Sequence, residues 1–552
     1  KLVALMVGAS VLATGCIKET TQLNGAATSE QVGESPFAAD GMIASIPAIL
    51  ITNNIYGGEY HDDFGYPSLL IQTDHAIGEV FPSNAYSGGN QYYDRFQYWH
   101  YQFSLGPTGI CSLVWYNYYQ FIKSTNDLIS VCGDNAALAE QRGIAKAYRA
   151  LYYLDLARLY DPLYAVSTER PEYQAALATI EGLTVPIVTE ETTEDLAKNN
   201  DRATREEMFN FIFADLEDAL VCLEGYAQEK PFYPTEAFIH GLYARAYMWL
   251  GGEDFVNDGL NGELPSGLAA YELAKQHAEK ALQFSGGAIM TEDQWTNTTT
   301  GFNTVVPAWI MSAVYSSETI YSNLHQHSAH LVPEAMYGYG QYTSLGVSKQ
   351  VYDNLSDTDF RKSLIKGPDT TYNDFKNSTA LDEESFSLFA PYTFFKFRPG
   401  SGAQTDSTVG GAVALPLMRN EEMYFIQMEA AYHISGDAAA RDLLIQFMAN
   451  RDSNYNCFRT GEEVLNEIIA QKALEHWGEG IVMYDMKRLD MGVKCGFKGT
   501  NYYVEGRHNS DGRLPWWNYC IPQGELERNE GITFNNPDPS ESLKPVQDKD
   551  LQ

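Results

Sequence analysis

The first residues with an evident chemistry form a short N-terminal segment that ends at a cysteine. Lys1 is followed by an apolar run over residues 2–12 and then by Ala13-Thr14-Gly15-Cys16. A basic start, an apolar run too short to cross about 30 Å of hydrocarbon and small residues before a cysteine are typical of a bacterial lipoprotein signal. Residues 1–15 are therefore predicted to be a signal peptide and Cys16 to be the site of lipid attachment. The polar segment 16–35 is predicted to be a lipidated, flexible tether.

Aromatic side chains provide a second candidate chemistry. The chain has 37 Tyr, 26 Phe and 8 Trp, which together make up 13% of its residues. Flat rings stack on the apolar C–H faces of sugars, while amides, carboxylates and backbone groups bind the hydroxyls. Trp115, Trp249 and Trp477 occupy helical positions and are predicted to be core residues. The ligand-binding candidates lie outside clear helical patterns: Trp99, Trp295, Trp309, Tyr337, Tyr339 and Tyr342.

Two clusters of polar residues could bind a metal ion, although neither has a specific spacing. The first is a histidine-rich stretch, and imidazole is a common metal ligand. A solvated loop is the simpler interpretation of that spacing. The second is rich in oxygen ligands for Ca²⁺ but lacks the EF-hand register, so we expect a hydrated loop and no cofactor. The two sets are His325, His327, His330 and Glu334, and Asp254, Asn257, Asp258, Asn261 and Glu263.

Charge and motif content argue for a binding protein that is not an enzyme. The formal net charge of −35 disfavours nucleic acid and anionic lipid surfaces as ligands. The chain has no Gly-x-Ser-x-Gly elbow, phosphate-binding loop or His-Glu-x-x-His helix. A pair of carboxylates at glycosidase separation could still form in three dimensions among the 72 acidic residues. The six cysteines after Cys16 show no CxxC pair, and we expect buried free thiols.

The elements that must position these residues are amphipathic helices. Apolar residues recur every three to four positions over residues 141–160, and Thr204 with Glu207 forms a capping box before another helix. Further helices are predicted over 235–250 and from about 271 to the Gly286-Gly287 stop. The 235–270 spacing approximates one tetratricopeptide repeat of about 34 residues.

The same helical pattern returns near the C-terminus, over residues 421–435, 438–450 and 464–477. The sequence therefore predicts an all-α fold with degenerate tetratricopeptide-like helix pairs at about 141–284 and 421–477. Between these pairs, residues 285–415 are predicted to be a long irregular insertion, and loops of this length usually carry function. Residues 36–552 are predicted to form a single domain.

Several segments, taken in order, resemble one known family. They are Trp115-Tyr116-Asn117-Tyr118-Tyr119, residues 147–160, the Pro416, Arg419, Glu422 and Tyr424 pattern, Glu475-His476-Trp477-Gly478-Glu479-Gly480, and Ile521-Pro522-Gln523-Gly524-Glu525. On these residues the chain is similar to the SusD/RagB outer-membrane nutrient-binding lipoproteins of Bacteroidetes. The resemblance covers nearly the whole chain.

The resemblance implies a function and a set of partners. It implies a SusD-like helical domain at the cell surface, anchored in the outer membrane through its N-terminal lipid. The helical face would pack against a SusC-like TonB-dependent transporter, which the domain closes as a lid, and the loops would bind an oligosaccharide or polysaccharide. Two alternatives are open: a RagB-like receptor for peptides, and a docking scaffold without its own ligand. Glycan binding predicts dependence on loop Trp and Tyr side chains, whereas a peptide receptor predicts grooves that pair with a backbone.

Overall fold

The computed structural model describes residues 41–53, 55, 61–82, 106–163, 179–339, 345–540 and 544–551. The predicted signal peptide, the tether with Cys16, and the candidates Trp99 and Tyr342 lie outside these residues.

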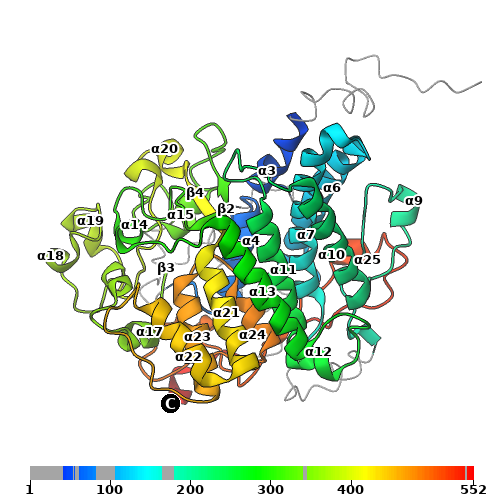
Figure 1. The fold of residues 1–552 in the computed structure, drawn as a ribbon. Coiled ribbons are helices and arrows are strands. Elements are labelled where there is room, and N and C mark those ends of the chain that lie inside the picture. Colours follow the sequence, from blue (N-terminus) through cyan, green and yellow to red (C-terminus); the bar gives the residue numbers. More distant parts are fainter. Residues whose placement is uncertain are drawn as a thin grey trace, which may run out of the picture.

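Two blocks of long helices form the body of the molecule (Figure 1). In the first block, α6 packs on α7, α7 on α10, and α11 on α13, and in the second block α21 packs on α22 and α23. The α13–α21 contact joins the blocks, although about 135 residues separate them in sequence. The helices are α6 (Ile110–Cys132), α7 (Ala139–Tyr160), α10 (Arg205–Cys222), α11 (Glu236–Leu250), α13 (Gly267–Ser285), α21 (Asn420–Ser435), α22 (Asp437–Met448), α23 (Glu462–Glu475) and α24 (Val482–Arg488).

Local chemistry sets the helix boundaries where the sequence predicts them. Thr204 Oγ1 accepts a hydrogen bond from the Glu207 N–H, and the Glu207 carboxylate accepts one from the Thr204 N–H, so the predicted capping box starts α10. Helix α13 ends at Gly286, whose φ of 82° is the left-handed conformation that glycine adopts without a Cβ clash. The predicted all-α class is confirmed, with helices near their predicted bounds.

Residues 286–419 form the insertion between the two blocks, and they contain more regular structure than the sequence predicts. Strand β2 (Trp309–Val314) pairs antiparallel with β4 (Ala414–Arg419), and Trp309 lies opposite Arg419. The insertion also contains short helices, which periodicity over one turn cannot reveal. These elements are α14 (Glu292–Thr296), α15 (His327–Leu331), β3 (Leu345–Gly346), α17 (Lys349–Asn354), η2 (Phe360–Leu364), α18 (Tyr372–Phe375), α19 (Glu383–Ser387), η3 (Gly400–Gly402) and α20 (Ser407–Gly411).

Short elements before and after these parts complete the fold. The N-terminal β1 pairs antiparallel with β3 of the insertion. The elements are α3 (Ser45–Leu50), α4 (Tyr66–Ala76), β1 (Phe81–Pro82), η1 (Ala136–Leu138), α9 (Glu194–Ala197), α12 (Glu253–Asn257), η4 (Val504–Gly506), η5 (Pro515–Trp517), α25 (Gln523–Leu526) and η6 (Asp548–Asp550).

One large cluster of buried apolar side chains extends from α3 through both helical blocks and the insertion to Ile532. The six cysteines in the described residues are free thiols, as predicted, and all except the half-buried Cys222 are buried. Within the described part of the chain, no helix is both long and apolar enough to cross a membrane.

Candidate functional site

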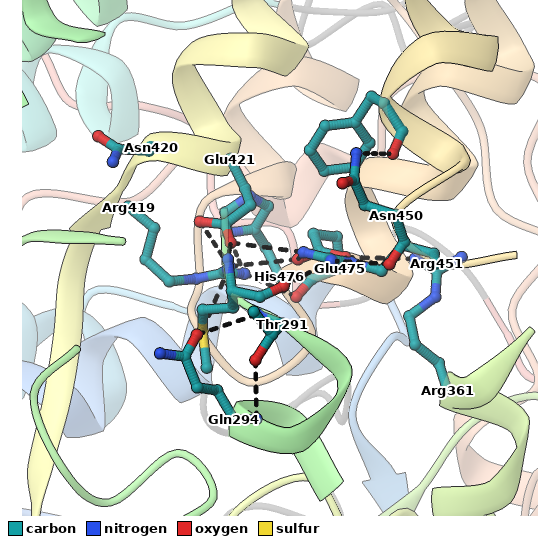
Figure 2. Close-up of polar contacts among 12 residues, drawn as sticks. Thr291, Gln294, Arg361, Arg419, Asn420, Glu421, Asn450, Arg451, Glu475 and His476 are labelled. Carbon is teal, nitrogen blue, oxygen red and sulfur yellow. Dashed lines mark hydrogen bonds and ion pairs between the residues drawn. The ribbon is translucent and has the colours of Figure 1, made fainter. Parts of the chain in front are cut away.

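A buried network of charged side chains fixes the insertion to the C-terminal helices (Figure 2). The guanidinium of Arg451 donates two hydrogen bonds of 2.9 Å to the Glu475 carboxylate, and Arg419 donates a third of 3.2 Å. Arg361 approaches the same carboxylate at 3.4 Å. Burial alone would raise the pKa of Glu475, but the three arginines lower it well below its ordinary value.

A second carboxylate extends the network into the insertion. Glu479 accepts hydrogen bonds from Arg419 Nε at 2.9 Å and from Lys396 Nζ at 2.7 Å. Lys396 also donates to the backbone carbonyls of Glu475 and Trp477. Burial lowers the pKa of Lys396 to about 8, so its ammonium group is charged at neutral pH beside Glu479.

The network holds both ends of the insertion. At its start, Met290 donates its N–H to Glu421 at 2.7 Å, and its carbonyl accepts from Arg451 at 2.8 Å. Next to it, Thr291 and Gln294 form the capping box of α14 (Figure 2). At its end, Arg419 closes β4. The insertion therefore leaves and re-enters the helical body at one network of charged side chains. We call this network the charged anchor; it consists of Arg361, Lys396, Arg419, Glu421, Arg451, Glu475 and Glu479.

The insertion and residue 61 also build a cluster of histidine and tyrosine rings. We call His61, Tyr321, His325, His330 and Tyr339 the histidine–tyrosine cluster. The His61 ring stands edge-on to His325 at 4.8 Å and hydrogen-bonds to the Tyr339 hydroxyl through Nδ1. His330 lies 5.4 Å from Tyr339 and hydrogen-bonds through Nε2 to the His61 carbonyl at 3.0 Å.

Tyr321 is the member of the cluster that faces solvent. Its side chain is 72% exposed, while Tyr339 is 5% and His325 is 6% exposed. The Tyr321 ring packs edge-on against His325 with a centroid distance of 5.6 Å, and Ser322 Oγ contacts His325 Nδ1 at 2.7 Å. An exposed ring is therefore braced by a buried side chain that is itself hydrogen-bonded.

His327 and His330, two buried histidines of this region, are neutral at physiological pH. Burial lowers the pKa values of His327 and His330 to about 3. A neutral imidazole offers one donor and one acceptor, which suits hydroxyl groups as well as metal ions. Chemically, this surface can stack an apolar ring face on Tyr321 and bind hydroxyls with the exposed Asn323 amide beside it.

The C-terminal part of the chain is similar to a known protein family. Residues 342–538 match the model of the SusD family. The match includes β4, α21 and α23, which carry the charged anchor.

Solved structures extend the fold to the rest of the chain. A SusD-like carbohydrate binding protein from Bacteroides vulgatus ATCC 8482 has 20% sequence identity and a TM-score of 0.65, over 91% of this chain and 97% of that chain. A SusD superfamily protein from Bacteroides fragilis has 19% identity and a TM-score of 0.63, over 90% and 99%. No curated protein matches the chain. The chain therefore has the SusD-like fold.

The sequence segments that resemble the SusD family are largely structural here. Arg419, Glu421, Glu475 and Glu479 all belong to the charged anchor. The three glutamate carboxylates are each paired with arginine or lysine side chains.

The structure separates the predicted ligand-binding residues into different environments. Trp295 lies in α14 and is fully buried, with Lys396 and Arg451 over its ring at 5.3 and 5.5 Å. Trp309 begins β2, is 6% exposed and donates to Met290 Sδ at 3.2 Å. The prediction that both tryptophans lie in irregular loops is wrong, and neither offers an accessible face to a ligand.

The predicted tyrosines lie closer to the cluster. Tyr339 belongs to it but is buried, and Tyr337 is half-buried, with its carbonyl accepting from the Asn323 side chain at 3.3 Å. Tyr321, which the sequence shows only as one of many loop aromatics, is the exposed ring. A Tyr-x₃-His spacing on an exposed segment is the signal that could have singled it out.

Several side chains of the two suggested metal sites are bound to other side chains of the protein. Glu334 pairs with Arg398 at 3.0 Å and accepts from Thr379 Oγ1 at 2.6 Å. In the second set, Asp258 and Asn261 both bind Arg205, at 2.6 and 3.0 Å, and Asp254 pairs with Arg513. The described residues contain no group of three or more His, Cys, Asp or Glu side chains that could hold a metal ion.

Proposed function

We propose that this chain is a cell-surface nutrient-binding lipoprotein that captures an oligosaccharide or polysaccharide. It delivers this ligand to a SusC-like TonB-dependent transporter of the outer membrane, which it closes as a lid. The SusD-family match and the likeness to a SusD-like carbohydrate binding protein support this proposal. Lipid attachment at Cys16 and the tether 16–35 are part of the proposal, since they would hold the domain beside such a transporter.

The observation that carries the sugar-binding proposal is the braced, exposed ring of Tyr321. A sugar ring stacks well only on an aromatic face that is accessible and does not lose much conformational freedom on binding. Tyr321 is 72% exposed and is held by His325. Among the predicted candidates that the structure describes, both tryptophans and Tyr339 are buried.

The arrangement of the helical body and the insertion is compatible with a lid on a transporter. The helical body and the insertion occupy different sides of the molecule (Figure 1). A partner on the helical face would leave the histidine–tyrosine cluster accessible, so nutrient and transporter could be held at the same time.

Glycan binding by purified Tyr321→Ala protein tests the proposed site. We expect the variant to bind its preferred polysaccharide about five-fold or more weakly, because loss of one stacking ring costs about 1 kcal/mol. The measurement is affinity electrophoresis or calorimetry over a panel of polysaccharides and peptides. Phe458→Ala is the matched control, because Phe458 is 86% exposed but lies outside the cluster; its affinity should be unchanged.

The other outcomes select the alternatives. Peptide binding without glycan binding would favour the RagB-like receptor. If neither class of ligand binds, a docking scaffold is the better description. If Tyr321→Ala and Phe458→Ala lose glycan affinity equally, the histidine–tyrosine cluster is not the binding site.

A further inference from the structure

A groove of about 850 Å³ lies on another side of the molecule from the histidine–tyrosine cluster. It is formed by α6, the segment 186–200 that contains α9, and the C-terminal segment 522–529 that contains α25. We call it the α6 groove. In Figure 1, α9 and α25 lie at one side of the helical body, and the α18–α20 part of the insertion lies at the other. The groove volume is within the range of small-molecule sites, about 300–1,000 Å³.

The wall that α6 contributes is aromatic. Trp115 and Tyr119, one helical turn apart, contact each other with ring centroids at 4.7 Å. Trp115 also packs edge-on against Tyr160 at 5.2 Å, and the Tyr119 hydroxyl donates to the Pro186 carbonyl at 2.7 Å. Tyr116 lines the same groove and is 42% exposed. Trp115 is buried and Tyr119 is half-buried, so they fix this wall to the core, and Tyr116 is the ring that borders open space.

The facing walls are locked together by hydrogen bonds. The Asn200 N–H donates to Asn529 Oδ1 at 2.9 Å, and Asn529 Nδ2 donates back to the Asn200 carbonyl at 2.8 Å. Glu530 donates its N–H to the Lys198 carbonyl at 2.8 Å. These hydrogen bonds hold the facing walls together without any contribution from a ligand, although the two segments lie more than 300 residues apart in sequence. A preformed site loses little entropy when it binds.

The polar groups of the groove suit hydroxyls. Gln120, half-buried on α6, and Asn200 both border it with amide groups. The charges on its rim include both signs, such as Arg528 and Glu525, and Lys198 is paired with Glu194 at 2.8 Å. A groove with balanced charges does not select an anion.

The backbone of the groove is not available to a peptide strand. The carbonyl of Ile187 accepts from Asn200 Nδ2 at 2.8 Å, and that of Pro186 accepts from Tyr119. The Val188 N–H donates to the Tyr153 hydroxyl, and the Val188 carbonyl accepts from Asn126. Strand addition needs unpaired N–H and C=O groups, so this wall disfavours peptides.

We propose that the α6 groove is a second binding site, which takes a neutral oligosaccharide that stacks on the exposed ring of Tyr116. The proposal goes beyond capture at the histidine–tyrosine cluster and does not require that cluster to bind. Two sites on different sides of the molecule would let one long polysaccharide, or two chains, be held with an avidity that neither site has alone.

Four forms of the purified protein test this proposal: wild type, Tyr116→Ala, Tyr116→Phe and Tyr321→Ala. The probes are neutral α-glucan, β-glucan, xylan and mannan oligosaccharides, with oligogalacturonate and mixed peptides as the other ligand classes. We expect Tyr116→Ala to weaken binding of one neutral oligosaccharide about five-fold or more, and Tyr116→Phe to retain it. Hydrogen exchange should show ligand protection of residues 110–120 and 522–529.

The outcomes keep the two sites distinguishable. If Tyr116→Ala weakens glycan binding and Tyr321→Ala does not, the result supports a site in the α6 groove and contradicts a site at the histidine–tyrosine cluster. If only Tyr321→Ala weakens glycan binding, the result overturns the α6 groove as a binding site. Protection confined to the insertion would also overturn it. Binding of only oligogalacturonate or only peptides at the groove would overturn the assignment of a neutral sugar.

Discussion

At the scale of single residues, this molecule buries many charged side chains. Arg205, Arg361, Arg398, Arg419 and Arg451 are among its largest fully buried side chains. Removing an ion from water costs several kcal/mol, so each guanidinium needs a carboxylate and further hydrogen bonds. Glu475 meets three of these arginines at once, so its loss would leave three buried guanidinium groups without one of their carboxylate partners.

We predict that Glu475→Gln destabilises the protein by about 3–5 kcal/mol, because buried positive charges lose their partner while their desolvation cost remains. Urea unfolding followed by circular dichroism measures this change. Glu279→Gln is the control, since Glu279 pairs with Lys275 at 3.8 Å on an exposed helix face, and its effect should be about 0.5 kcal/mol or less. Similar effects of both substitutions would show that the anchor contributes little.

At the scale of elements, α6 shows how one helix can serve the core and a binding surface together. Leu113, Tyr118 and Phe121 face inward and are 0–1% exposed, while Tyr116 and Gln120 border the groove. This division follows from the 3.6-residue period, which turns successive residues by about 100°. The first backbone N–H groups of helix α10, like those of any helix, lack helical partners, and Thr204 of the capping box satisfies one of them.

Removal of the N-cap should weaken α10 without disturbing the core. Thr204 is exposed, and its Oγ1 accepts from the Glu207 N–H at 3.2 Å. Thr204→Ala is expected to lower the free energy of unfolding by about 1 kcal/mol. Thr204→Ser retains the hydroxyl and should stay close to wild type in the same thermal or urea melts. A destabilised serine variant would indicate that the methyl group matters more than the cap.

At the scale of the whole molecule, burial of neutral histidines links folding to pH. Burial lowers the pKa values of His75 and His240 to about 4, and of His277, His327 and His330 to about 3. In the unfolded chain these groups titrate near 6.5. Below pH 6.5 the unfolded state therefore binds more protons than the folded state. The free energy of unfolding falls as the pH is lowered, until the pH reaches the pKa values of the folded state.

His327 offers a test of this pH dependence. It is 3% exposed and packs edge-on against Phe397 at 4.8 Å, so leucine can fill its place. Between pH 7 and pH 5, wild type should lose about 1–2 kcal/mol more of its unfolding free energy than His327→Leu, because the variant has one fewer group to protonate on unfolding. Urea titrations at both pH values measure the difference. Parallel losses would contradict the assignment of a neutral, buried His327.

The helices, their caps and the burial of Trp115, Trp249 and Trp477 followed from sequence, because periodicity and capping act within a few residues. The burial of Trp295 and the exposure of Tyr321 did not follow from the sequence, although both residues lie in the same insertion. Trp295 is buried because Lys396 and Arg451, 101 and 156 residues away, fold over its ring. Tyr321 is 72% exposed, and its ring meets the His325 ring in a T-shaped contact. Contacts between distant segments decide which loop aromatics a ligand can reach, and no local pattern encodes them.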